Sequence, residues 1–250
     1  MVILAALAGM LIPRLGFIKD SADTVTSAAG SNELANNLEI YKSAVGSYPL
    51  RMDSLIKDEG SGIYDRFSST GASASVPTWL AMEDLQATTG PSGTAGGWWY
   101  SVVRSGVLNV ADHVLYTASS DPSSSGLTIR DYQLFPGDGN TAVVVTTGTT
   151  GTRILEAAGF TSTTLPANVK LVAFGIGPRC GLLGQTMSNV PRHSAQPQEY
   201  YGRFIAIFAA YDYGFTAAVK PMQLRCVVDS RGFPVDYRLN QYKLTAPKQE

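Results

Sequence analysis

The chain has 250 residues, of which 44% are hydrophobic, so it can bury the core of one large domain or two modest ones. Only 16% of the residues are charged and the formal net charge is −1, which argues against the clustered Lys and Arg of a nucleic-acid-binding surface. We therefore expect a folded protein without a nucleic-acid partner.

The first segment, residues 1–45, is predicted to form one long helix with two different parts. Residues 1–12 (MVILAALAGMLI) carry no charge, and Pro13 follows them. Beyond Pro13, apolar residues recur at spacings of three and four, which indicates a helix with one buried face. In its last third these residues are Leu34, Leu38, Tyr41 and Val45. Gly46 is suited to end the helix, and Pro49 prevents its continuation.

Two patches within residues 1–56 resemble the type IV pilin-like family, which includes pilins and type II secretion pseudopilins. Residues 2–16 (VILAALAGMLIPRLG) are similar to the downstream part of the family's N-terminal hydrophobic helix. Residues 38–56 (LEIYKSAVGSYPLRMDSLI) are similar to the major-pseudopilin pattern of a Tyr-Lys helix end and a Gly-x-Tyr-Pro turn. Residues 229–237 (DSRGFPVDY) keep the D-x-x-G-x-P-x-x-Y frame seen late in pseudopilin domains.

The sequence departs from the family at its start, because the basic leader, the cleavage-site Gly and the acidic residue after it are not present. If Pro13 corresponds to the family proline, these features belong upstream of Met1. Twelve apolar residues are too few for a ~30 Å hydrocarbon layer, which needs about 20. We therefore expect either further upstream residues or a helix meant for a filament core. The alternative is the apolar region of a signal peptide, but no basic segment precedes it.

The resemblance implies a structural subunit of an extracellular filament, with no enzymatic activity and no cofactor. Identical subunits would pack side by side in a helical assembly after passing through the inner membrane, with the help of assembly machinery. The small residues Ala5, Ala6, Ala8 and Gly9 would allow close helix approach. The residues expected to pack in the filament core are Val2, Leu4, Ala5, Ala8, Gly9, Leu11, Ile12 and Pro13. The residues expected at the turn between helix and head are Tyr41, Gly46, Tyr48 and Pro49.

Residues 46–250 are predicted to form a β-rich head domain. The strand candidates are residues 98–103, 113–118, 130–135, 142–147, 170–176, 204–211 and 224–228. Helical turns are expected at residues 78–86, after Asp53 as a cap for Leu55 and Ile56, and at residues 152–158 with Thr152 as N-cap. Strands predominate without regular β-helix-β alternation. The expected fold class is therefore α+β, with an antiparallel sheet resting on the long helix.

The search for catalytic motifs finds none. His113 and His193 are the only histidines, which excludes a dense histidine metal site. There is no G-x-S-x-G elbow and no G-x-x-x-x-G-K-[ST] phosphate loop. Asp121 and Asp138 lie in loops that could hold Ca²⁺, but each loop offers a single carboxylate where such a site usually has several. Solvated turns are the favoured interpretation.

Cys180 and Cys226 are the only cysteines, an even number in a chain expected to be exported, which favours a disulfide. The alternatives are two buried free thiols, or a thiol nucleophile with His193 as its base.

Two further functions remain open. The helix could be only the tether of a membrane-anchored binding module. Either Trp98 or Trp99 could then stack on surface glycans, although packing in the core is the favoured interpretation of these two residues. The third class is an exported hydrolase with a dispersed site. A tethered module would purify as monomers, whereas a hydrolase needs a pocket with paired carboxylates or an activated nucleophile.

Overall fold

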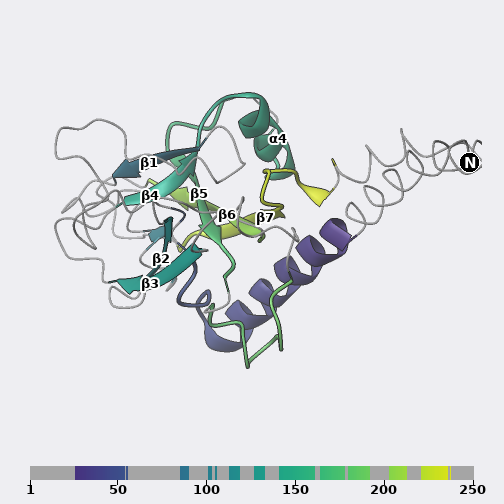
Figure 1. Ribbon diagram of the computed structural model, residues 1–250. Coiled ribbons are helices and arrows are strands. Elements are labelled where there is room, and N and C mark those ends of the chain that lie inside the picture. The colour runs from purple at the N-terminus through teal and green to yellow at the C-terminus, as the bar shows by residue number, and fades with distance from the viewer. Residues whose placement is uncertain are drawn as a thin grey trace, which may run out of the picture.

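The computed structural model of the protein describes a set of segments that together define an α+β domain. These are residues 26–53, 55, 85–89, 101–102, 105, 113–118, 127–132, 141–160, 164–177, 180–191, 203–212, 221–235 and 237. Of the predicted helix over residues 1–45, the structure therefore describes the part from residue 26 onward. This part, here called helix 26–45, is the blue-violet helix beside the sheet in Figure 1.

An antiparallel sheet of five strands is the centre of the domain, in the order β1-β4-β5-β6-β7. The strands are β1 (Leu85–Thr89), β4 (Thr141–Val145), β5 (Val169–Gly175), β6 (Ile205–Tyr211) and β7 (Gln223–Val228). Strands β2 (His113–Ala118) and β3 (Leu127–Tyr132) form a separate antiparallel pair. All pairs among these strands are antiparallel, which confirms the predicted type of sheet.

The core lies on β5 and β6, whose side chains are buried almost without alternation. In β6 (IAIFAAY) the first six residues are all buried, and in β5 (VKLVAFG) only Lys170 is exposed. Continuous burial along a strand means that both faces of the sheet are covered. Figure 1 shows helix 26–45 and α4 (Thr149–Ala157) on opposite sides of the strands, and each contributes side chains to the buried cluster that contains β5 and β6.

Helix 26–45 buries the stripe that its sequence predicts, except at its end. Leu34, Leu38 and Tyr41 are buried in the same cluster as the sheet residues. Val45 follows Tyr41 by four residues and should lie on the same face of the helix, but it is 52% exposed. The prediction for Val45 is wrong because the chain turns at Gly46 and a later residue, Tyr48, fills the core there.

Close contact between helix 26–45 and the start of β6 depends on a glycine. A Cβ placed on Gly30 would lie 2.9 Å from Cζ of Phe204, the fully buried residue just before β6. Because Phe204 is enclosed, it has little freedom to move away. Gly30 thus allows the helix backbone to approach the aromatic ring directly.

Helix α4 begins earlier than predicted and ends in a Schellman motif. Its first residue is Thr149, and Thr152 lies in the first turn, where its hydroxyl donates to the Gly148 carbonyl. The prediction of Thr152 as N-cap is therefore wrong. At the other end, Gly159 has φ +84° and its N–H donates to Glu156, while the N–H of Phe160 donates to Leu155. These two bonds satisfy carbonyls that the helix end leaves unpaired.

Most predicted strands are present, and the exceptions have identifiable causes. Five of the seven match a strand to within two residues at each end, and β3 begins three residues before its predicted start. Strand β1 lies where the end of a helical turn was predicted, at residues 78–86. Pairing with β4 makes this segment a strand, and β4 is too remote in sequence for a local pattern to predict the pairing. In the strand predicted at residues 98–103, Ser101 and Val102 are helical and buried. Tertiary packing overrides the β-propensity of this segment.

The segment after β7 is a tight turn organised by Asp229. Its carboxylate accepts hydrogen bonds from the N–H groups of Arg231 and Phe233, and Gly232 adopts φ +78°. Pro234 then forms an antiparallel bridge with Val228. The Asp, Gly and Pro of the D-x-x-G-x-P-x-x-Y frame thus each have a structural role in this turn.

The Tyr of this frame connects the turn to α4. Its residue, Tyr237, stacks on Phe233 with ring centroids 5.1 Å apart. The guanidinium of Arg153 on α4 lies 4.5 Å from the Tyr237 ring centroid. A guanidinium over an aromatic face is attracted by the ring's negative face, so this contact ties α4 to the end of the sheet.

Candidate functional site

The residues expected to pack in a filament core lie outside the described residues. These are Val2, Leu4, Ala5, Ala8, Gly9, Leu11, Ile12 and Pro13. Asp121, Asp138, His193, Trp98 and Trp99 also lie outside them. The candidate site that the structure does describe is the predicted turn between helix and head, which contains Tyr41, Gly46, Tyr48 and Pro49.

The helix ends where the sequence predicts. Gly46 has φ +86°, and its N–H donates to the carbonyl of Lys42 at 2.8 Å. A left-handed residue with this single bond is the αL form of helix termination, which favours glycine. The chain then turns inward, and Tyr48 and Pro49 are both buried.

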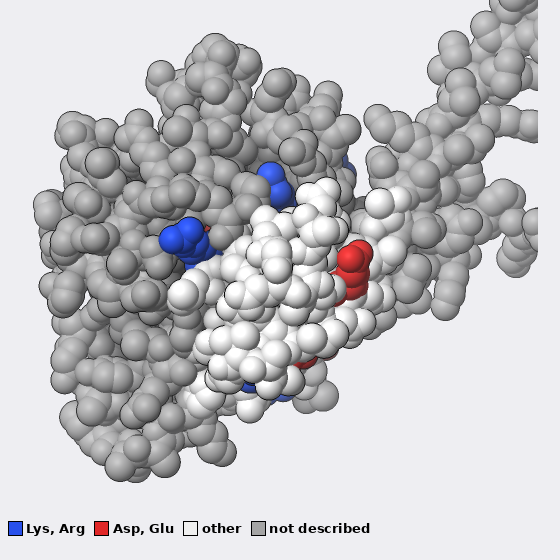
Figure 2. All heavy atoms as spheres, turned by 90° about the horizontal axis from the view of Figure 1, so that it is seen from below, with Lys and Arg blue, Asp and Glu red and all other residues white. Residues whose placement is uncertain are grey.

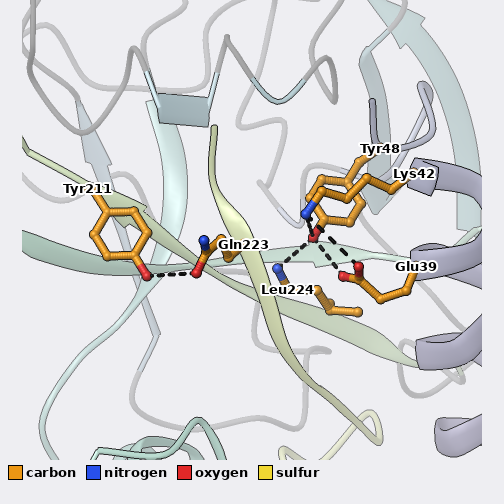
Figure 3. Close-up of polar contacts among 6 residues, drawn as sticks. All are labelled: Glu39, Lys42, Tyr48, Tyr211, Gln223 and Leu224. Carbon is orange, nitrogen blue, oxygen red and sulfur yellow. Dashed lines mark hydrogen bonds and ion pairs between the residues drawn. The ribbon is translucent and has the colours of Figure 1, made fainter. Parts of the chain in front are cut away.

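The Tyr48 hydroxyl is the centre of a polar cluster that joins helix and sheet. It donates to Glu39 Oε1 at 2.8 Å and accepts from Lys42 Nζ at 2.9 Å. It also accepts from the backbone N–H of Leu224 on β7 at 2.8 Å. Figure 3 shows these groups converging on the hydroxyl between helix 26–45 and β7. We call Glu39, Lys42, Tyr48 and Leu224 the Tyr48 cluster.

The ring of Tyr48 is also fixed by its surroundings. Only 1% of the residue is exposed, and its ring meets Phe208 of β6 edge-on with centroids 4.9 Å apart. Lys42 Nζ lies 4.5 Å from the ring centroid on the helix side. The backbone N–H of Tyr48 donates to the carbonyl of Ser105 at 2.9 Å. Apolar burial and hydrogen bonds therefore both fix this side chain.

The electrostatics of the cluster keep Tyr48 protonated. Burial raises the pKa of its hydroxyl well above the ordinary value of 10.0, and the Glu39 carboxylate raises it further. The Leu224 N–H and the positive charge of Arg225 oppose this increase without reversing it. A phenol with a raised pKa is a poor general base near neutral pH. The cluster is suited to holding two elements together rather than to proton transfer.

The chain after Tyr48 is bonded to the end of β5. The backbones of Asp53 and Gly175 exchange two hydrogen bonds, each 2.9 Å, in an isolated antiparallel bridge. Gly181 N–H donates to the carbonyl of Leu50. The predicted helix capped by Asp53 is wrong, because Leu55 has φ +59°, a left-handed conformation that no helix contains. Pairing with β5 determines this segment instead.

The predicted disulfide between Cys180 and Cys226 is also wrong, since both are free thiols. Cys226 on β7 lies opposite Ile207 of β6, which lies opposite Ala173 of β5. Strand β6 thus separates β7 from β5, and two strand spacings amount to roughly 10 Å. A disulfide needs Cα atoms about 5.5–6 Å apart. Cys180 follows β5 in the turn whose next residue, Gly181, donates its N–H to the Leu50 carbonyl.

The environment of the two cysteines does not suit nucleophilic chemistry. Burial raises the pKa of Cys180 to about 12, with a smaller contribution from the Asp53 carboxylate. Burial also raises the pKa of Cys226 to about 12. The thiolate is the reactive form of cysteine, and at neutral pH both groups stay protonated.

The described segments contain neither a metal centre nor a membrane-spanning helix. Within them, no group of three or more His, Cys, Asp or Glu residues is placed to hold a metal ion. Among the helices described there, none combines the length and hydrophobicity that crossing a membrane requires.

Comparison of the chain with protein-family models, with curated proteins and with solved structures finds no match.

Proposed function

We propose that this chain is a structural subunit of a type IV pilus-like or pseudopilus extracellular filament. In this proposal residues 1–45 form one continuous helix, residues 46–250 form the head, and residues 1–12 of many copies pack in a shared core. The resemblance of residues 2–16 and 38–56 to the pilin-like family is the starting point. The observation that supports it most is the joining of helix 26–45 to β7 through the Tyr48 cluster.

A filament subunit needs such a junction for a mechanical reason. If residues 1–12 are held in a core of neighbouring helices, any load between core and head passes through helix 26–45. Leu34, Leu38 and Tyr41 resist this load by burial against the sheet. The Tyr48 cluster adds hydrogen bonds close to the helix end, where a helix is otherwise prone to fray. A flexible tether would not need this rigidity.

The outer surface of the helix is compatible with close neighbours. Figure 2 shows the side on which helix 26–45 lies, and its described surface is mostly uncharged. Ile40 on this helix is 57% exposed. An apolar side chain in contact with water raises the free energy of the subunit, and a neighbouring subunit that covers it would remove this cost.

The test is a variant of the proposed core helix. Gly9→Leu keeps residues 1–12 apolar and helix-prone, so a membrane tether should tolerate it. A filament core should not, because the larger side chain is repeated in every subunit and forces neighbouring backbones apart. The matched control is Leu4→Ile, which keeps side-chain volume. Both variants are expressed from the native gene.

Two measurements are made on the same cells: retention of the chain in the membrane and surface filaments by negative-stain electron microscopy. Loss of filaments with normal membrane retention in Gly9→Leu, and normal filaments in Leu4→Ile, is the expected result. Filaments of normal number and length in Gly9→Leu would contradict the proposed core. The membrane-anchored binding module, including a glycan-binding one, would then be the better hypothesis.

A further inference from the structure

Helix α4 packs against β7, and an arginine is held on aromatic rings at each end of this contact. Arg153 belongs to α4, and its guanidinium carbon lies 4.5 Å from the ring centroid of Tyr237 and 5.3 Å from that of Phe233. Arg225 belongs to β7, and its guanidinium carbon lies 5.6 Å from the ring centroid of Phe160, just beyond the end of α4. We call these five residues the α4–β7 seam.

The two arginines lie apart along the seam. Arg153 meets Phe233 and Tyr237, which follow β7, whereas Phe160 meets Arg225 in the first half of β7. The positions of Arg153 and Phe160 differ by seven residues, which correspond to about 10 Å at the helical rise of ~1.5 Å per residue. The seam therefore carries two separate cationic groups on one surface.

Arg225 is ordered although its side chain is exposed. Its Nη2 donates to the Tyr211 hydroxyl at 2.6 Å, and this hydroxyl donates to Gln223 Oε1 at 3.1 Å (Figure 3). The pairing register with β6 passes from Cys226 to Leu224, so Arg225 lies at a β-bulge, a feature that redirects side chains. An arginine that is already ordered loses less conformational entropy when it binds a ligand.

Both guanidiniums keep donors for a ligand. Arg225 is exposed and Arg153 is partly exposed, and within the part of the chain that the structure describes neither forms an ion pair with a carboxylate. The N–H donors of a guanidinium lie in its plane, so stacking on a ring does not use them. Two of these donors match the two oxygens of a carboxylate. The seam thus offers a carboxylate site at each end.

A negative charge on the same helix restricts which polyanion fits. Glu156 is exposed and lies between Arg153 and Phe160 in the sequence. A ligand with closely spaced charges would place some of them near this carboxylate, where like charges repel. A polysaccharide with a carboxylate on every second sugar can instead place a neutral sugar beside Glu156.

We propose that the α4–β7 seam binds an acidic polysaccharide, with one carboxylate on Arg225 and a second on Arg153. Nucleic acid is the less suitable polyanion, because the formal net charge of −1 provides no long-range attraction for its dense phosphates. The inference goes beyond the proposed filament and does not depend on it. The seam belongs to the head, so a single subunit is sufficient for binding.

The test measures binding of a hyaluronate octasaccharide, which has a carboxylate on every second sugar, to the full chain by isothermal titration calorimetry. The matched ligand is the same octasaccharide with its carboxylates reduced to alcohols. The carboxylate form should bind, with an affinity that falls as salt is added, and the reduced form should not. A hyaluronate disaccharide has one carboxylate and should bind about tenfold more weakly, because it cannot reach both arginines.

Variants of the chain locate the site. Arg225→Gln and Arg153→Gln should each weaken octasaccharide binding about tenfold, the effect of losing a hydrogen bond to a charged group. Arg225→Lys keeps the charge without the planar donors and should restore only part of this loss. Lys170→Gln is the matched control, because it removes a positive charge from β5, two strands from β7, and should bind like wild type.

Four results would overturn the proposal. The octasaccharide does not bind wild type at millimolar concentration, or its reduced form binds equally well. Its affinity is unchanged in both glutamine variants, which would place the site elsewhere. A thymidine oligonucleotide of similar length binds more tightly, which would make the seam a nucleic-acid surface.

Near-ultraviolet circular dichroism checks the fold of each variant. If a glutamine variant loses the native spectrum, Arg225→Lys and the two ligand comparisons on wild type decide the question. The number of filaments in Gly9→Leu bears only on the proposed function, and octasaccharide binding bears only on this inference.

Discussion

Tyr48 and Leu224 are separated by 176 residues, yet the Tyr48 hydroxyl accepts a 2.8 Å hydrogen bond from the Leu224 amide. The bond joins the segment that leaves helix 26–45 to the edge strand β7. It therefore fixes where the helix end lies relative to the sheet. Removing Tyr48 should affect both elements at once.

Tyr48→Ala is expected to destabilise the protein strongly. The substitution removes a fully buried ring from its contact with Phe208, and truncation of such a ring costs about 3–5 kcal/mol. The free energy of unfolding, obtained from denaturant titration, measures this effect. Ile40→Ala is the control, because Ile40 is 57% exposed and exposed substitutions usually change stability by about 0.5 kcal/mol or less. Equal stability of the two variants would show that the Tyr48 turn contributes nothing to the fold.

Stability should fall at alkaline pH in a way that depends on Tyr48. The pKa of its hydroxyl is raised by burial above the ordinary value of 10.0, so the unfolded chain loses this proton at a lower pH than the folded chain. Its contribution is fully present below the ordinary tyrosine pKa and is lost as pH rises above it. Other tyrosines and lysines also titrate there, and comparison with Tyr48→Phe isolates the contribution of this group. Stability curves that stay parallel through this range would contradict the expected linkage.

The two cysteines should be slow to react in the folded protein and fully reactive after unfolding. Burial raises the pKa of both Cys180 and Cys226 to about 12, which leaves almost no thiolate near neutral pH. Intact mass after alkylation, with and without denaturant and without reductant, measures the number of free thiols. Two alkyl groups are expected under denaturing conditions. A chain that gains none until reductant is added contains a disulfide, contrary to the structure.

Local patterns predicted much of the secondary structure. The spacing of Leu34, Leu38 and Tyr41 identified the buried face of the helix, because a helical repeat is a property of neighbouring residues. The left-handed preference of glycine identified Gly46 as the stop. Apolar runs identified β5 and β6, where burial on both faces leaves a continuous hydrophobic signal. For the site, the sequence indicated that Tyr48 belongs to an ordered turn.

Several of the predictions that were wrong concern contacts between remote segments. Asp53 pairs with Gly175 instead of capping a helix, and β1 exists because β4 offers it a partner. Cys226 lies on β7, whereas Cys180 lies in the turn that follows β5, and β6 pairs between these two strands. For Asp53 and β1 the local sequence permits more than one conformation, and hydrogen bonds to a distant strand select one of them.

The sequence by itself thus determined the buried face of helix 26–45, the residue at which that helix stops and the positions of β5 and β6, since those choices depend on side-chain periodicity and backbone freedom within a few residues. The tertiary structure alone decided that the hydroxyl of Tyr48 meets Glu39, Lys42 and the amide of Leu224. The order of strands in the sheet brings β7 to that position, and strand order is a balance of long-range pairing energies that no local pattern records.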